Sequence, residues 1–173
     1  RLPESIAEFP RVLRLTEEDG VPDMAGYVFF YTTEACYLAH DADRALESAR
    51  SLEVISRTLG EHLGLVAHTD LAFAYAHLAA GRATDAIEAA RTALELLRRV
   101  DKAYAGKAAS LLAEALLQAG EHAAAETAAV DAIAICRRSL RTVYEAVAHG
   151  VLARALLRRD GAVAHEAAKA ALG

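Results

Sequence analysis

The stretch from Asp70 to Val100 constrains the fold more than any other, because it has the pattern of two amphipathic helices joined by one Gly-Arg turn. Small residues recur where two helices would approach closely, and larger apolar residues recur between them at helical spacing. Gly81 is placed to end the first helix, since the residue after a helix terminus often needs a positive φ, which glycine adopts without steric cost. We therefore predict a helical hairpin here.

The hairpin pattern recurs along the chain with a period of about 40 residues, as in proteins built from stacked repeats. Residues 111–117 match residues 151–157 at an offset of 40, and Gly81 has its counterpart in Gly120 at an offset of 39. The turn of the last copy is Asp160-Gly161, which predicts helices over 141–159 and 162–172. The predicted copies are 26–66, 67–105, 106–145 and 146–173, and residues 1–25 are interpreted as the remnant of a preceding helix or as a linker.

Composition supports an all-α fold and excludes several classes of partner. Tryptophan is absent, and the three prolines all lie at or before residue 22, which favours helices over strands. The formal net charge is −5, the reverse of the basic surface that nucleic-acid binding requires, so we expect no direct nucleic-acid binding. No stretch of 18 residues is apolar without interruption by a charged residue, so we expect no membrane partner.

The two cysteines indicate the cellular compartment in which the protein resides. Cys36 and Cys136 lie far apart in the sequence, in different copies of the repeat, each on an apolar helical face. Buried free thiols in a reducing compartment are favoured over a disulfide. We therefore expect a cytoplasmic protein.

The spacing around each turn resembles the helical hairpin of the tetratricopeptide repeat. Around Gly81, a small residue stands seven positions earlier at Ala74, and alanines follow five and twelve positions later at Ala86 and Ala93. The family period is about 34 residues, so these hairpins are longer, and Ala90 stands where the family usually has an aromatic residue. The resemblance implies a right-handed superhelical solenoid of antiparallel hairpins, in which the first helices line a concave face.

Residues 111–135 and 150–172 further resemble the C-terminal repeat regions of bacterial class III adenylate/guanylate cyclases with an AAA-like ATPase, and of related ATPase-bearing transcription activators. This second resemblance implies a regulatory segment of a larger bacterial signalling protein, which docks a protein or peptide partner or senses a ligand. The partner is then a separate protein or another domain of the same chain. The alternative is a free-standing tetratricopeptide adaptor that binds a peptide.

The resemblance also implies which residues point into the concave groove. They are Tyr27, Phe30, Glu34, Tyr37, His68, Tyr75, Lys107, Glu114, Gln118, Arg154 and Arg158. Such a groove would be aromatic at one end and polar to basic at the other, which suits an extended peptide with an apolar anchor and acidic groups. Substitutions at Tyr75, Glu114 and Arg154 are then expected to leave the melting temperature almost unchanged. The alternative is that Phe30 and Leu71 pack in the core between repeats.

No motif supports catalysis, a metal or a cofactor. Gly106-Lys107 lacks the earlier glycine and the following Ser or Thr of a phosphate loop. His165-Glu166 lacks the second histidine that would complete a zinc pair on one helical face. We therefore expect no catalytic residue, no metal ligand and no bound cofactor.

Pairs of arginines end several predicted helices, as at Arg98-Arg99 and Arg137-Arg138. Cations in the last turn interact favourably with the helix dipole, which explains this placement without a ligand. The alternative is that some of them line a groove for an acidic segment or a nucleotide.

The last copy carries no polar capping helix. An end repeat without a polar outer face exposes apolar surface, so we expect the parent protein to continue in both directions. A homodimer through the uncapped ends is the alternative.

Overall fold

The computed structural model describes residues 2–60 and 63–172, and for some of these, including 162–172, the backbone alone. Every regular element in this part of the chain is a helix, so the all-α prediction is confirmed. The helices are α1 (Leu2–Glu18), α2 (Pro22–Leu38), α3 (Ala42–Thr58), α4 (Leu63–Ala79), α5 (Ala83–Val100), α6 (Lys102–Gln118), α7 (His122–Arg138) and α8 (Thr142–Leu172).

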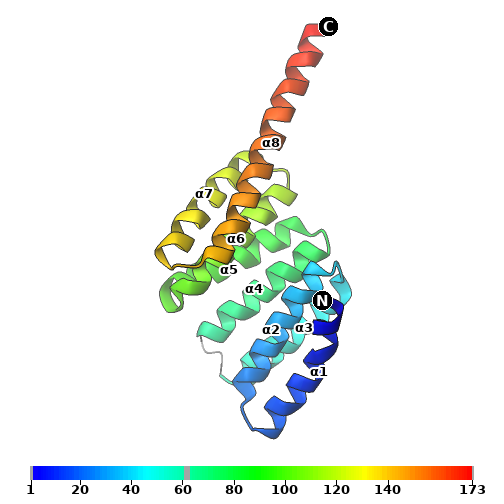
Figure 1. Ribbon diagram of the computed structural model, residues 1–173, viewed down its shortest axis with the longest axis vertical. Coiled ribbons are helices and arrows are strands. Elements are labelled where there is room, and N and C mark those ends of the chain that lie inside the picture. The colour runs from blue at the N-terminus through cyan, green and yellow to red at the C-terminus, as the bar shows by residue number, and fades with distance from the viewer. Residues whose placement is uncertain (1, 61–62, 173) are drawn as a thin grey trace.

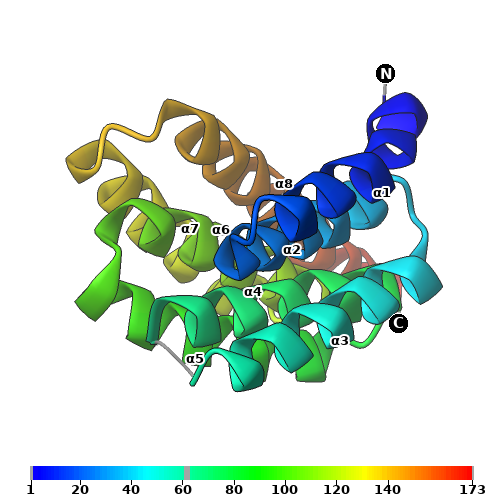
Figure 2. The same cartoon turned by 90° about the horizontal axis from the view of Figure 1, so that it is seen from below.

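The helices lie side by side in chain order along the long axis of the molecule (Figure 1). Close backbone contacts join each helix to the next one, and they also join α2 to α4, α4 to α6 and α6 to α8. The even-numbered helices therefore form one continuous series. Figure 2 shows α3 and α5 along one edge of the molecule, with α2 and α8 towards the opposite edge.

The turns behave largely as predicted. Gly81 and Gly120 adopt φ values of 71° and 81°, in the left-handed region that glycine tolerates. After Gly81 the chain reverses, and the N–H of Arg82 donates to the carbonyl of His77 at 2.9 Å, as in a Schellman cap. The equivalent positions after α2 and α7 hold His40 and Leu140, at φ 58° and 56°, although neither is glycine.

The predicted break at Asp160-Gly161 is wrong, because α8 continues without interruption from Thr142 to Leu172. Unlike Gly81, Gly161 does not have a positive φ, and glycine within a helix costs only about 1 kcal/mol relative to alanine. The alanine-rich sequence that follows favours continuation of the helix. The last part of α8 consequently projects beyond the other helices (Figure 1).

The core is built from small residues at the helix crossings. Ala74 and Ala113 are fully buried, as their place in the repeat predicts. A Cβ atom on Gly106 would lie 2.6 Å from the Sγ of Cys136, so α6 and α7 pack too closely there for any side chain. Cys36 and Cys136 are buried free thiols, which confirms that prediction.

Over residues 2–60 and 63–172, no helix is both long enough and apolar enough to cross a lipid bilayer.

Candidate binding site on the even-numbered helices

All eleven residues predicted to line the groove lie on even-numbered helices, but they differ in exposure. Phe30, His68, Tyr75 and Lys107 are buried, Tyr27, Glu34, Tyr37 and Glu114 are partly buried, and Gln118, Arg154 and Arg158 are exposed. The prediction of an open groove is therefore wrong for the first four.

Tyr75 is only 6% exposed, so its side chain belongs to the core and does not face an open groove. Phe30 and Leu71 are both fully buried, so the alternative placement of these two in the core between repeats is confirmed. The physical reason is that α2, α4 and α6 converge closely enough for their aromatic side chains to fill the space between them.

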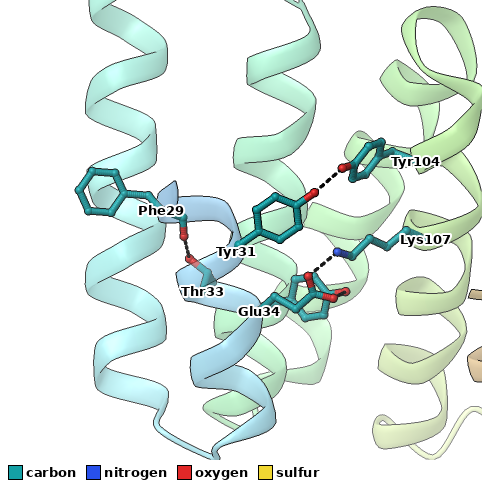
Figure 3. Close-up of polar contacts among 7 residues, drawn as sticks. Phe29, Tyr31, Thr33, Glu34, Tyr104 and Lys107 are labelled. Atoms are coloured by element: carbon teal, nitrogen blue, oxygen red, sulfur yellow. Dashed lines mark hydrogen bonds and ion pairs between the residues drawn. The ribbon is translucent and has the colours of Figure 1, made fainter. Parts of the chain in front are cut away.

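Lys107 lies at the centre of this region. Its side chain is 2% exposed, and its Nζ donates a hydrogen bond of 2.6 Å to Oε2 of Glu34 on α2. The hydroxyl of Tyr75 on α4 donates to the other carboxylate oxygen, Oε1, at 3.1 Å. Figure 3 shows Glu34 and Lys107 pointing toward each other from α2 and α6. Three helices are thus joined through one carboxylate.

Aromatic rings surround the Lys107 ammonium. The ring centroids of Phe30, Tyr31, Tyr75, Tyr104 and Tyr144 lie 4.6, 5.6, 5.4, 5.9 and 5.3 Å from Nζ. These distances are within the range of cation–π attraction. The Tyr31 and Tyr104 hydroxyls also form a hydrogen bond of 2.6 Å, which extends the contact between α2 and α6 (Figure 3). We call these five residues, together with Glu34 and Lys107, the lysine cage.

Local sequence explains how the helices present the cage. Tyr31 and Glu34 are three residues apart on α2, and Tyr104 and Lys107 are three apart on α6, so each pair shares one helical face. Helix α6 begins where the Asp101 carboxylate accepts hydrogen bonds from the N–H groups of Ala103 and Tyr104, at 2.9 and 3.3 Å. This cap fixes the residue at which α6 begins.

Burial shifts the pKa values of several side chains in the lysine cage. Desolvation lowers the pKa of Lys107 below its ordinary value, and the carboxylate of Glu34 opposes this shift. Desolvation also raises the pKa of Tyr75, and the nearby Glu34 charge raises it further. The pKa of Tyr144 rises to about 12, chiefly through burial. Tyr75 and Tyr144 are therefore neutral hydrogen-bonding groups near neutral pH.

A cavity of about 230 Å³ adjoins the lysine cage. We call it the apolar pocket, and its lining residues are Glu34, Tyr37, Leu38, Tyr75, Lys107, Ser110, Leu111, Glu114, Val143, Tyr144 and Val147. Leu38, Val143 and Val147 are 58%, 71% and 50% exposed, which is unusual for aliphatic side chains that share one depression. The pocket thus has an apolar, solvent-accessible rim.

Part of the polar end predicted for the groove is neutralised by an internal ion pair. Glu114 on α6 forms a two-pronged ion pair with Arg154 on α8, with Nη1 2.9 Å from Oε1 and Nη2 on Oε2. Arg154 is therefore already paired, and it is not free to receive an acidic group as predicted. Gln118 donates a hydrogen bond to the carbonyl of Leu78 at 3.3 Å, and Arg158 is exposed on α8.

Sequence reasoning missed Tyr31, Tyr104 and Tyr144 of the lysine cage, and it also missed Leu38, Val143 and Val147 at the rim of the apolar pocket. One available signal was the repeat itself, because Tyr104 and Tyr144 occupy equivalent positions in successive copies. No sequence signal marked the rim, since Leu38 and Val143 come from helices that are distant in the chain.

Glu34 and Glu114 are the two carboxylates that line the apolar pocket. Both carboxylates that line the pocket are occupied by cations of the protein, so neither is placed as a general base. No group of three or more His, Cys, Asp or Glu side chains within the described residues could hold a metal ion, and His165-Glu166 lies outside the described side chains.

No model of a known protein family matches the chain, and no curated protein matches it.

Proposed function

We propose that this chain is a non-catalytic helical-repeat scaffold that binds a protein partner through the apolar pocket. The observation that carries the proposal is the cluster of exposed Leu38, Val143 and Val147 around a pocket whose charges are paired internally. A neutral pocket with an apolar rim favours an aliphatic or aromatic side chain of a peptide segment over an acidic group. The proposed occupant therefore has one apolar anchor.

In this proposal the hairpins form a right-handed superhelical solenoid of the tetratricopeptide kind. Its support is the recurring turn glycines, the regular spacing of the copies and the contacts of each helix with its near neighbours in the chain. The pocket then lies on the face built from the first helix of each hairpin, which is where this kind of repeat receives extended peptides.

We further propose that the scaffold regulates a larger bacterial signalling protein that carries a cyclase or an ATPase. The support for this step is the sequence resemblance of residues 111–135 and 150–172. A free-standing adaptor is the alternative. The complete open reading frame distinguishes them, because a reading frame without a cyclase or nucleotide-binding module would refute the regulatory role.

The binding role is tested by selecting a phage-displayed peptide library on the immobilised protein and measuring the selected peptides by fluorescence polarisation. We expect the peptides to share an apolar residue and to lose about tenfold or more in affinity to the Val143→Asp variant, because a charge would then line the pocket. Val54→Asp is the matched control, since Val54 is 63% exposed on α3 and does not line the pocket. Equal affinity for the two variants would refute the proposal.

A further inference from the structure

A second cavity lies on the other side of α6, away from the apolar pocket. Its volume is about 520 Å³, and it is lined by Arg98, Lys102, Ala105, Ile135, Arg138 and Ser139. We call it the basic cavity. Pockets for small ligands in proteins have volumes of about 300–1,000 Å³, so this one has the size of a ligand site.

The titratable residues that line the basic cavity are all cations. Arg98 comes from the end of α5, Lys102 from the start of α6 and Arg138 from the end of α7. Among the residues that the structure describes, no carboxylate lies within ion-pair distance of any of the three. Asp101 does not line the cavity, and its carboxylate caps α6. Three unpaired cations thus converge in a chain whose net charge is −5.

The helix dipole does not by itself account for this convergence. A last-turn arginine is favoured at the end of any helix, and that argument applies equally to Arg98 and its neighbour Arg99. Arg98 differs because it shares a cavity with cations from two other helices. Arg98, Lys102 and Arg138 are exposed to solvent around one cavity, so an anion that enters it is attracted by all three cations.

The remaining lining residues suggest what else the ligand carries. Ala105 is almost fully buried and Ile135 is half-buried, so the exposed part of Ile135 gives the cavity an apolar surface beside its cations. Ser139 contributes a hydroxyl, which already donates to the carbonyl of Ile135 and keeps its lone pairs free to accept. An anion with a flat, weakly polar part fits this combination better than a bare inorganic ion does.

We infer that the basic cavity binds a nucleotide, with its phosphates held by Arg98, Lys102 and Arg138 and its base against Ile135. Guanidinium groups suit phosphate because their planar N–H donors match its oxygens in pairs. This site is separate from the apolar pocket, so its existence does not depend on the proposed scaffold function. A nucleotide bound between α5, α6 and α7 would join two successive hairpins.

The test is isothermal titration calorimetry of the whole chain with ATP, inorganic triphosphate and adenosine as separate probes. Low salt, about 50 mM, keeps the screening length long enough to detect weak anion binding. We expect ATP to bind several-fold more tightly than triphosphate, and adenosine to give no measurable heat. Arg98→Gln and Arg138→Gln should each weaken ATP binding by about tenfold or more, since each removes charge-assisted hydrogen bonds.

Arg99→Gln is the matched control, because it removes an equal charge one residue away from Arg98 but outside the cavity. It should change ATP affinity by less than about twofold, and circular dichroism should show that all three variants remain folded. Three results would each overturn the inference. They are the absence of ATP binding at millimolar concentration, equal binding of triphosphate and ATP, and equal weakening by Arg99→Gln and Arg98→Gln.

Discussion

Separating Glu34 from Lys107 tests whether the lysine cage holds the fold together. Removal of one partner of a buried ion pair leaves an uncompensated charge and typically costs about 3–5 kcal/mol. The two partners differ in exposure, with 2% for the Lys107 side chain and 24% for that of Glu34. After Lys107→Met, Glu34 can recruit water and still accepts the hydrogen bond from Tyr75. After Glu34→Leu, the ammonium, whose side chain is only 2% exposed, keeps no charged partner.

We therefore expect an asymmetric pair of effects. Glu34→Leu should lower the free energy of unfolding by about 3 kcal/mol, the lower end of the range because five aromatic rings still attract the cation. Lys107→Met should cost about 1–2 kcal/mol, and the double variant should recover most of the loss, because two apolar side chains replace the pair. Urea denaturation followed by circular dichroism measures all three values.

Glu53 and Arg57 supply the matched control. Their ion pair has nearly the same length, 2.7 Å against 2.6 Å for Glu34–Lys107, but the Glu53 and Arg57 side chains are 35% and 68% exposed on α3. Glu53→Leu should therefore cost no more than about 0.5 kcal/mol. If Glu34→Leu were as mild as Glu53→Leu, or if Lys107→Met cost more than Glu34→Leu, the reasoning from burial would be refuted.

Three further predictions concern the backbone, the close crossing and a half-buried carboxylate. Gly81→Val should lower the free energy of unfolding by about 1–2 kcal/mol through backbone strain alone, because no atom lies close to its site. Leu140→Gly should be neutral or should stabilise the protein by up to about 1 kcal/mol, because Leu140 has a positive φ. Thermal melts that showed the reverse order would contradict this reasoning. Gly106→Ala should lower the free energy of unfolding by about 1–3 kcal/mol, since its Cβ would collide with Cys136. Gly150→Ala, in open space on α8, should raise it by about 0.5–1 kcal/mol. The midpoints of urea denaturation compare the two variants. Burial, with a smaller contribution from Glu53, raises the pKa of Asp70 from 3.8 to about 6. Between these two values the folded state binds more protons than the unfolded state, so the free energy of unfolding should fall as pH rises through this window. Asp70→Asn should remove that slope and stabilise the protein by about 1 kcal/mol at pH 7, and unchanged slopes in pH-dependent melts would show that Asp70 is not the group responsible.

The parts of the fold that depend on local chemistry could be predicted from the sequence. Gly81 and Gly120 end helices because of their own backbone freedom, and that requirement is visible in the sequence. The continuation of α8 through Gly161 could not be predicted in the same way. Whether a chain folds back at a glycine depends on whether the next segment finds a surface to pack against, and that is a property of the assembled helices.

In the candidate site, too, the features that depend on local sequence could be predicted, and those that depend on helix packing could not. The period of the repeat placed Glu34 and Lys107 on helices of the same series, but it gave no distance between those helices. Burial of Lys107 depends on how closely α2, α4 and α6 converge, and the small residues at the crossings set that spacing jointly. Pairing of Arg154 with Glu114 was likewise missed, since the two residues are 40 positions apart and each alone looks like a free surface charge.

The Glu34–Lys107 contact spans 73 residues and passes over α4, the helix between its two partners. Stacked-repeat proteins in which each repeat contacts only its neighbours can unfold one repeat at a time from either end. Here the hairpin of α2 and α3 cannot separate from α4 without also breaking a buried ion pair with α6. Unfolding of the first hairpin is therefore coupled to that of the third, and amide protons of α2 and α6 should exchange with solvent in one cooperative event.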